Sequence, residues 1–252
     1  MTLPATEDFT AGDYTNIATL ANWTSNIVGL MTVSNQCTSY QHGLAHWDAD
    51  TFSPNQYSEV TIVQNYTYHG MGVAVLCDAS TGDGYAYYGD DSASQIIEIV
   101  SGSDSTLSSG LSAFANSDVI KLESSVSGST TTLTAYINDA EEDSTTDTSF
   151  TSGYAGVYGQ NDAGTQAYID NWTGDDLAAS FTVDQEGYRW RNDDEGEATA
   201  TWATAAQDAT ATVNLETNIR LRALINATGD PATANYQLEY RKQGTSDWIK
   251  VE

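Results

Sequence analysis

Hydrophobic and polar residues alternate along most of this chain, which is the pattern of half-buried β-strands. The alternation is clear in five segments of the first 180 residues: 59–63, 72–76, 95–100, 119–123 and 133–137. Clusters of Gly, Asp, Ser and Asn separate them, as expected of turns. Only residues 111–116 and 16–22 could make a helical turn or two. The sequence therefore predicts an all-β protein built as a sandwich of antiparallel strands.

The charge divides the chain into two regions. Residues 1–180 hold 23 acids and one base, Lys121, whereas residues 181–252 hold 12 acids and seven bases. The second region alternates as well, at 188–191, 198–202, 211–215, 219–225 and 236–241. We therefore expect two domains, 1–178 and 181–252, joined at Ala178, Ala179 and Ser180. The second has the length and the number of strands of a small immunoglobulin-like or fibronectin-like sandwich.

Composition excludes several classes of protein. The 252 residues are 40% hydrophobic and 10% aromatic, too much core-forming material for a disordered chain despite a net charge of -27. A surface this negative repels nucleic acid and anionic lipid. No apolar run reaches the roughly 18 residues of a membrane span. The first residues lack the basic start and apolar stretch of a secretory signal, so we expect that the chain either has lost its signal or leaves the cell by another route, such as release of an assembled particle on lysis. We expect no nucleic-acid partner and no membrane insertion.

Two cysteines, Cys37 and Cys77, are too few for a disulfide framework. One bridge between them stays open, but two buried free thiols are the simpler interpretation.

An ordered series of segments in the first region resembles a known superfamily. The series runs from Asp8-Phe9-Thr10 and Trp23, through 50–52, 56–62, 84–87, 118–123 and 133–138, to 153–158 and 168–174. It resembles the concanavalin A-like lectin and glucanase superfamily, with the laminin-G-like branch closest. The resemblance implies a jelly roll of two large antiparallel sheets, in which the closing strand around Trp172 returns beside the opening one.

The second region resembles a module of tailed-bacteriophage virion proteins, in segments 188–196, 198–202, 225–231 and 236–241. Together the two regions imply a structural protein on the surface of a phage particle, as a capsid decoration or a tail appendage. Such a protein assembles in the host cytoplasm, contacts major capsid or tail proteins and cell-surface glycans, and forms homo-oligomers. Because it holds most of the bases, residues 181–252 are the better docking domain for an acidic neighbour, with the first domain pointing outward.

The superfamily also contains glycoside hydrolases, so catalysis needs a test. Retaining enzymes use two carboxylates about 5–5.5 Å apart. The family's hydrolases carry acids on one strand in the pattern Glu-x-Asp-x-x-Glu, and the most similar stretch here is Glu59, Thr61 and Gln64. Two of its three positions cannot ionise. The sequence therefore predicts no enzymatic activity.

Groups of acidic residues are candidates for calcium, which prefers carboxylate and carbonyl oxygens. The candidates are Asp48 with Asp50, expected on one face of a strand, and two pairs expected on loops, Asp78 with Asp83 and Asp90 with Asp91. Solvated turn carboxylates explain them more simply in a chain with 35 acids. His42 and His46 have the spacing of helical metal ligands, but the surrounding pattern is not helical and we interpret both as surface residues. We expect no cofactor, with calcium left open.

Aromatic residues beside acids are candidates for sugar binding, because lectin sites stack a ring on the sugar and fix its hydroxyls with polar groups. These are Trp47 beside Asp48, and Tyr85, Tyr87 and Tyr88 beside Asp90; packing in the core explains aromatic residues at strand spacing equally well. Trp23, Trp172, Trp190 and Trp202 we assign to the core.

The main hypothesis is thus a non-enzymatic virion surface protein that binds glycans. A secreted carbohydrate-binding lectin is the alternative, and a glycoside hydrolase is a weaker one.

Overall fold

The structure is a computed structural model of the whole chain. It describes residues 3–10, 12–13, 15–161, 166–177, 182–192, 194, 199, 201–212, 218–228, 239–240 and 249–250. The chain divides into two compact units, Met1–Leu177 and Ala178–Glu252.

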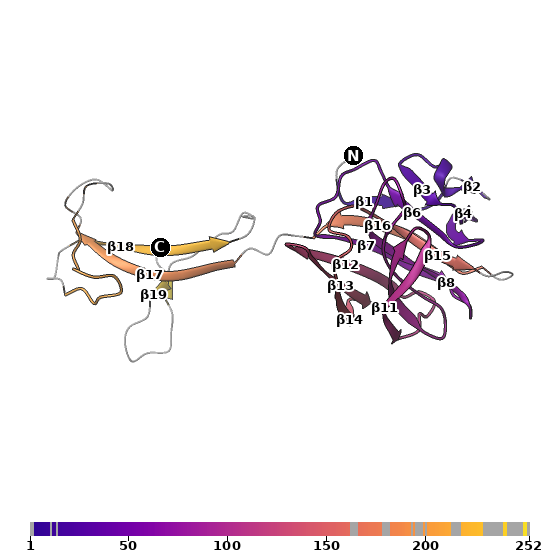
Figure 1. Cartoon of the computed structure of the whole chain (residues 1–252). Helices are drawn as coiled ribbons and strands as arrows, with labels where there is room; N and C mark the ends of the chain where they lie inside the picture. Colours follow the sequence, from indigo (N-terminus) through magenta and orange to yellow (C-terminus); the bar gives the residue numbers. More distant parts are fainter. Residues whose placement is uncertain are drawn as a thin grey trace. The chain divides into compact units, whose positions relative to one another are not determined.

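The first unit is a sandwich of two antiparallel sheets (Figure 1). The nine-stranded sheet has the order β14-β13-β12-β7-β16-β5-β4-β2, and β1 also pairs with β16. Its strands are β1 (Ala5–Glu7), β2 (Thr15–Asn16), β4 (Leu30–Val33), β5 (Gln36–Ser39), β7 (Gln56–Gln64), β12 (Val119–Ser127), β13 (Thr130–Ile137), β14 (Ala140–Asp147) and β16 (Tyr168–Asp176). The seven-stranded sheet has the order β11-β10-β9-β8-β15-β6-β3. Its strands are β3 (Trp23–Ile27), β6 (Gly43–Trp47), β8 (His69–Cys77), β9 (Gly84–Gly89), β10 (Ser94–Val100), β11 (Ser103–Leu111) and β15 (Tyr154–Asn161).

This topology confirms the predicted concanavalin A-like sandwich. The opening strand β1 lies antiparallel to the closing strand β16, with Glu7 opposite Trp172. The expected helical turn near residues 16–22 is one short 3-10 helix, Ile17–Thr19. The one expected at 111–116 was wrong, because Leu111 ends β11 and the following residues bond to neighbouring strands instead. Ser94 Oγ donates to the Ser112 carbonyl oxygen, and Phe114 N–H to that of Asp90.

Three tryptophans fill the space between the two sheets. Trp23 and Trp47 come from β3 and β6 of the seven-stranded sheet, and Trp172 from β16 of the nine-stranded one. The ring centres of Trp23 and Trp172 lie 4.8 Å apart, and the Trp47 ring stacks on Trp172 at 5.4 Å. The predicted core positions of Trp23 and Trp172 are therefore confirmed, and Trp47 packs in the core rather than at a sugar site.

A buried serine ties the two sheets together at this cluster. Ser58 Oγ accepts a hydrogen bond from Trp172 Nε1 at 2.9 Å and donates one to the Gly156 carbonyl oxygen at 2.6 Å. Ser58 lies on β7 and Gly156 on β15, so the second bond crosses from one sheet to the other.

The seven-stranded sheet is apolar on both faces. One face packs in the main core, and the other carries a second buried cluster: Leu44, Ala74, Cys77, Ala86, Ile97, Ile99 and Tyr158. β8 shows this most clearly, because all its residues after His69 are buried. The alternation predicted for residues 72–76 therefore does not separate a buried face from an exposed one, because both faces of the strand are covered.

The sheet covers this second cluster by curling. Asp104 on β11 and Tyr158 on β15 have β10, β9 and β8 between them, about 19 Å in a flat sheet. Tyr158 nevertheless donates its hydroxyl hydrogen to Asp104 Oδ2 at 2.6 Å. The edge strand therefore bends back over the sheet's own face.

The acidic run Glu141, Glu142 and Asp143 lies inside β14 and not in the hairpin turn before it. The turn falls earlier, where Asn138 and Asp139 adopt positive φ angles of 52° and 63°. Asn and Asp tolerate this conformation, which explains why the chain turns there.

In the second unit, β17 (Thr182–Asn192) pairs with β18 (Ile219–Thr228), and β19 (Glu239–Tyr240) with β20 (Ile249–Lys250). Trp190 is half-buried, but Trp202 is 41% exposed, so its assignment to the core was wrong. The predicted segments 198–202, 211–215 and 236–241 lie partly outside the described residues. The immunoglobulin-like sandwich and its bounds stay a prediction.

Cys37 and Cys77 are both buried and free, as the simpler interpretation expected. Burial raises the pKa of each thiol, so both stay protonated and unreactive at neutral pH. Within the described part of the chain, no helix is long and apolar enough to cross a membrane.

We predict that Ser58→Ala lowers the free energy of unfolding by about 1–3 kcal/mol, because it leaves the buried Trp172 N–H without an acceptor. Urea denaturation followed by tryptophan fluorescence measures the change. Ser105→Ala, at an exposed position of β11, is the matched control and should stay within about 0.5 kcal/mol. Equal effects of the two substitutions would contradict the role given to Ser58.

Candidate functional site

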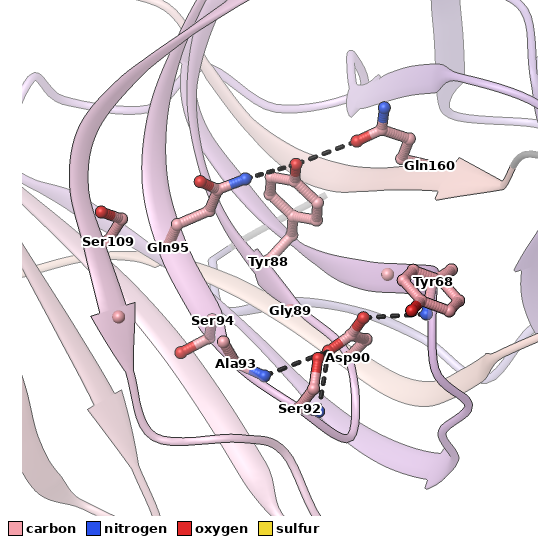
Figure 2. A pocket seen from close by; sticks show the side chains of 12 residues that line it. Tyr68, Tyr88, Gly89, Asp90, Ser92, Ala93, Ser94, Gln95, Ser109 and Gln160 are labelled. Atoms are coloured by element: carbon pink, nitrogen blue, oxygen red, sulfur yellow. Dashed lines mark hydrogen bonds between the residues drawn. The ribbon is translucent and has the colours of Figure 1, made fainter.

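A pocket opens where β8, β9, β10 and β15 of the seven-stranded sheet end (Figure 2). Its volume is about 340 Å³, in the range of a site for a small ligand. The lining combines aromatic rings, amides, small hydroxyls and one carboxylate. These residues are Tyr68, Gly70, Tyr88, Gly89, Asp90, Ser92, Ala93, Ser94, Gln95, Ser109, Gly110 and Gln160.

Tyr88 is held between two amides in the middle of this pocket, as Figure 2 shows. Its hydroxyl accepts a hydrogen bond from Gln95 Nε2 at 2.5 Å and donates one to Gln160 Oε1 at 2.9 Å. The ring also contacts Tyr158 edge-on, with centres 4.8 Å apart. These contacts fix the ring before any ligand arrives, which reduces the entropy lost on binding.

Gly70 leaves the space that the Tyr88 ring occupies. A Cβ atom at this position would lie 2.6 Å from Tyr88 Cδ2 and 3.0 Å from Cε2, closer than real contacts allow. The glycine on β8 therefore sets where the aromatic ring of β9 lies.

Tyr68 stands at the rim of the pocket and is 79% exposed. Its backbone has a positive φ of 67°, which is costly for a bulky side chain. Asp90 Oδ2 accepts the Tyr68 N–H at 2.9 Å and so helps to hold this conformation. An exposed aromatic ring kept in a strained turn beside a pocket is typical of a binding surface.

Asp90 gives the pocket a fixed negative charge. Burial acts to raise its pKa, but the Ser92 hydroxyl and the backbone N–H groups of Tyr68, Ser92 and Ala93 lower the pKa below its usual value. The side chain is therefore an anion at neutral pH. Among the described residues, none that lines the pocket is basic. An anionic ligand is disfavoured, whereas a neutral ligand rich in hydroxyls finds acceptors, donors and rings.

The sequence singled out part of this site. It named Tyr88 and Asp90, which the structure brings together here, but also Tyr85 and Tyr87, which are fully buried. The Tyr85 hydroxyl donates to Asp147 at 2.6 Å, and the Tyr87 ring packs edge-on against Phe114. Because successive side chains of a strand point to opposite faces, Tyr88 faces away from Tyr85 and Tyr87.

Sequence reasoning missed Tyr68, Gln95 and Gln160. Gln160 reaches Tyr88 from a strand distant in the chain, with β8 between them, so no local signal marks it. Gln95 faces Tyr88 across the β9–β10 hairpin, and the register of that hairpin was a usable signal. Tyr68 had one usable signal, a large aromatic residue within a short turn between two strands.

The carboxylates proposed for calcium serve as acceptors within turns. Asp78 Oδ1 accepts the N–H groups of Ser80 and Thr81, and Asp90 Oδ1 those of Ser92 and Ala93. Asp48 and Asp50 lie after β6 rather than on a strand face, where they bind the side chains of Thr24 and Trp47. Among the described residues, no group of three or more His, Cys, Asp or Glu side chains could hold a metal. Calcium stays a prediction without a site.

The two histidines were expected at the surface, and this was wrong for His46. His46 lies in β6, is fully buried, and packs on the Tyr154 ring at 5.1 Å between centres. Burial lowers the pKa of His46. The nearby carboxylates of Asp48 and Asp78 act to raise it, but the effect of burial is larger. His42 precedes the strand and is partly exposed, with Nε2 3.3 Å from Asp104 Oδ1.

Glu59 lies on β7 of the nine-stranded sheet, not on the sheet that carries the pocket. Burial raises its pKa, which Lys121 opposes and Asp139 supports. Its neighbours across the strands are Lys121 and Thr173, neither of them a carboxylate. The second acid that a retaining glycosidase needs is therefore not beside it on either adjacent strand.

Comparison with known proteins gives likenesses to solved structures only. No protein-family model and no curated protein matches the chain. A carbohydrate-binding module from Bacillus subtilis, CBM66, is 16% identical with a TM-score of 0.48, over 65% of this chain and 98% of that one. A β-glucanase from Bacillus licheniformis is 10% identical with a TM-score of 0.42, over 68% and 96%. A legume lectin-like domain from Entamoeba histolytica is 11% identical with a TM-score of 0.41, over 62% and 91%.

Both sugar-binding proteins and an enzyme stand among these likenesses. At this level of similarity they do not decide between binding and hydrolysis. The first unit is thus an all-β sandwich of concanavalin A-like fold with a preformed pocket in its seven-stranded sheet, and the pocket itself must indicate the ligand.

We predict that the protein loses stability as the pH falls through about 6.5. In this range His46 is protonated in the unfolded chain, whereas burial keeps it neutral in the folded protein, because its pKa is lower there. His46→Leu should flatten the plot of unfolding free energy against pH between about pH 7.5 and 5.5. Urea denaturation at each pH measures the slope. An unchanged slope in His46→Leu would contradict the prediction.

Proposed function

We propose that the first unit binds neutral carbohydrate through the pocket around Tyr88. One observation carries the proposal: a fixed aromatic ring is surrounded by amide, hydroxyl and carboxylate groups in one preformed hollow. Sugars present C–H groups on one face and hydroxyls at their edges. Aromatic rings bind the former, and short polar side chains bind the latter.

The charge of the chain narrows the ligand to uncharged glycans. Asp90 accepts hydrogen bonds from sugar hydroxyls but repels the carboxylates and sulfates of acidic polysaccharides. The net charge of -27 adds a long-range repulsion of the same sign. Gln160 offers its Nε2 group as a donor, since its Oε1 already accepts from Tyr88.

We predict that Tyr88→Ala weakens binding about tenfold or more, because it removes the ring together with its hydrogen bonds to Gln95 and Gln160. An array of neutral glycans identifies the ligand, and titration calorimetry with the strongest one measures the affinity. Tyr88→Phe keeps the ring and should lose less.

Tyr40→Ala is the matched control, because Tyr40 is an exposed tyrosine outside the pocket. Its affinity should equal that of the unchanged protein. A flat array at high protein concentration, or equal losses in Tyr40→Ala and Tyr88→Ala, would sink the proposal.

We also propose that the protein binds glycans without cleaving them, since Glu59 has no carboxylate opposite it on either neighbouring strand and lies on the other sheet from the pocket. Incubation with a panel of polysaccharides should release no reducing sugar. Release that disappears in Glu59→Gln would overturn this and revive the glycoside hydrolase.

A place on a virion surface, with capsid or tail proteins as neighbours and copies of the chain associated together, stays a prediction from the sequence. The pocket is compatible with it, because a displayed sandwich that holds host glycans needs the same chemistry as a free secreted lectin.

A further inference from the structure

Four of the eight basic residues of the protein gather on one pair of strands in the second unit. Arg189 and Arg191 lie on β17, opposite Arg222 and Arg220 of β18 respectively. Like charges directly opposite each other on antiparallel strands are destabilising. A cluster of this kind in so acidic a protein needs compensation from other groups.

Trp202 provides part of that compensation. Residues 201–208 run along β17, with hydrogen bonds from Asn192 to Thr201 and from Ala203 to Trp190. Trp202 pairs with Arg191 in this arrangement. The guanidinium carbon of Arg189 lies 4.2 Å from the centre of the Trp202 ring, and that of Arg191 lies 5.1 Å from it. Stacking on an indole ring stabilises both cations.

Arg189 is also held by backbone carbonyls. Its Nε and Nη2 groups donate to the Thr204 oxygen at 3.3 and 3.1 Å, and Nη2 donates to the Ala205 oxygen at 2.9 Å. Because carbonyls accept these hydrogens without neutralising the charge, Arg189 keeps a full positive charge in a fixed position.

Arg222 stands opposite Arg189 and is exposed. Its side chain makes no hydrogen bond or ion pair with the part of the chain that the structure describes. A hollow of about 280 Å³ adjoins both arginines, and its described lining holds no acid: Tyr188, Arg189, Trp202, Gln207, Arg222 and Ala223. Two positive charges, one of them fixed, thus face a space in which no described carboxylate balances them.

We propose that this arginine hollow binds a carboxylate of an extended acidic polypeptide segment from a partner protein. The planar guanidinium of Arg222 matches a carboxylate in two parallel hydrogen bonds, and Arg189 adds charge from the facing strand. Trp202 supplies an apolar wall beside the charged group, as is common at the centres of protein interfaces.

The chemistry of the hollow favours a polypeptide over a single small anion. Trp and Arg are enriched at the centres of protein interfaces, and Trp202 lines the hollow together with Arg189 and Arg222. Arg191, two residues along β17, is only 4% exposed, so the contact is centred on Arg189 and Arg222.

The test uses the full chain and a short synthetic peptide of alternating threonine and glutamate, in about 0.1 M salt to screen the acidic first unit. Calorimetry and tryptophan fluorescence should both detect binding that weakens as salt rises. Arg222→Gln should weaken binding about tenfold or more. Arg222→Lys should weaken it by an intermediate factor, because lysine keeps the charge but cannot make the two parallel hydrogen bonds of the guanidinium. Lys121→Gln removes one charge from the first unit and should leave binding unchanged.

No binding of the glutamate peptide, or equal affinity in Arg222→Gln and the unchanged protein, would overturn the proposal. Equal binding of a threonine and glutamine peptide would do so as well, because that peptide has no carboxylates. Binding of oligogalacturonate but not of the peptide would replace the protein partner by an acidic glycan. Because Arg222 is exposed, its substitution should leave the fold intact, and circular dichroism of each variant checks this.

Discussion

The first unit depends on the curl of its seven-stranded sheet. This sheet carries apolar side chains on both faces, and each apolar face must be covered. The nine-stranded sheet covers one of them through the tryptophan cluster and Ser58. The other is covered by the sheet itself, because the hydrogen bond from Tyr158 to Asp104 draws its edge strand back over the second cluster. Small residues such as Gly72 make the bend possible, since Tyr88 and Tyr158 lie on either side of it and their rings meet above it.

The pocket is a consequence of this curl. Tyr88 belongs to the same face as Tyr158, but it stands where the apolar cluster ends and polar side chains begin. Its ring is packed on one edge and bonded to Gln95 and Gln160 at the hydroxyl, so the core of the sheet fixes a group that also borders solvent. A rigid sheet with a turn at its rim thereby presents rings and polar groups in a set geometry, which is what recognition of a hydroxyl-rich ligand requires.

The two proposed binding sites carry charges of opposite sign and therefore favour different ligands. The pocket of the first unit holds one carboxylate, Asp90, and no base among its described residues, so uncharged ligands suit it. The hollow of the second unit holds Arg189 and Arg222 with no described acid, so carboxylates suit it. Seven of the eight bases lie in residues 181–252, but that region also holds 12 acids, so the preference of the hollow comes from the grouping of arginines on β17 and β18 and not from the net charge of the unit.

The sequence by itself determined the all-β class, the concanavalin A-like order of strands, the burial of Trp23 and Trp172, and the separation of charge. The all-β class and the separation of charge follow from local alternation and from composition, which are properties of neighbouring residues, whereas the order of strands was implied by the resemblance to a known superfamily. It named Tyr88 and Asp90, but it could not distinguish Tyr88 from the buried Tyr85 and Tyr87. It also did not predict that Trp202 is exposed and that His46 is buried. Those outcomes depend on which face of a strand meets which sheet and on how far a sheet bends. Only tertiary structure decided them, because side chains on strands distant in the chain, such as Tyr88 and Gln160, come together only when the sheets form.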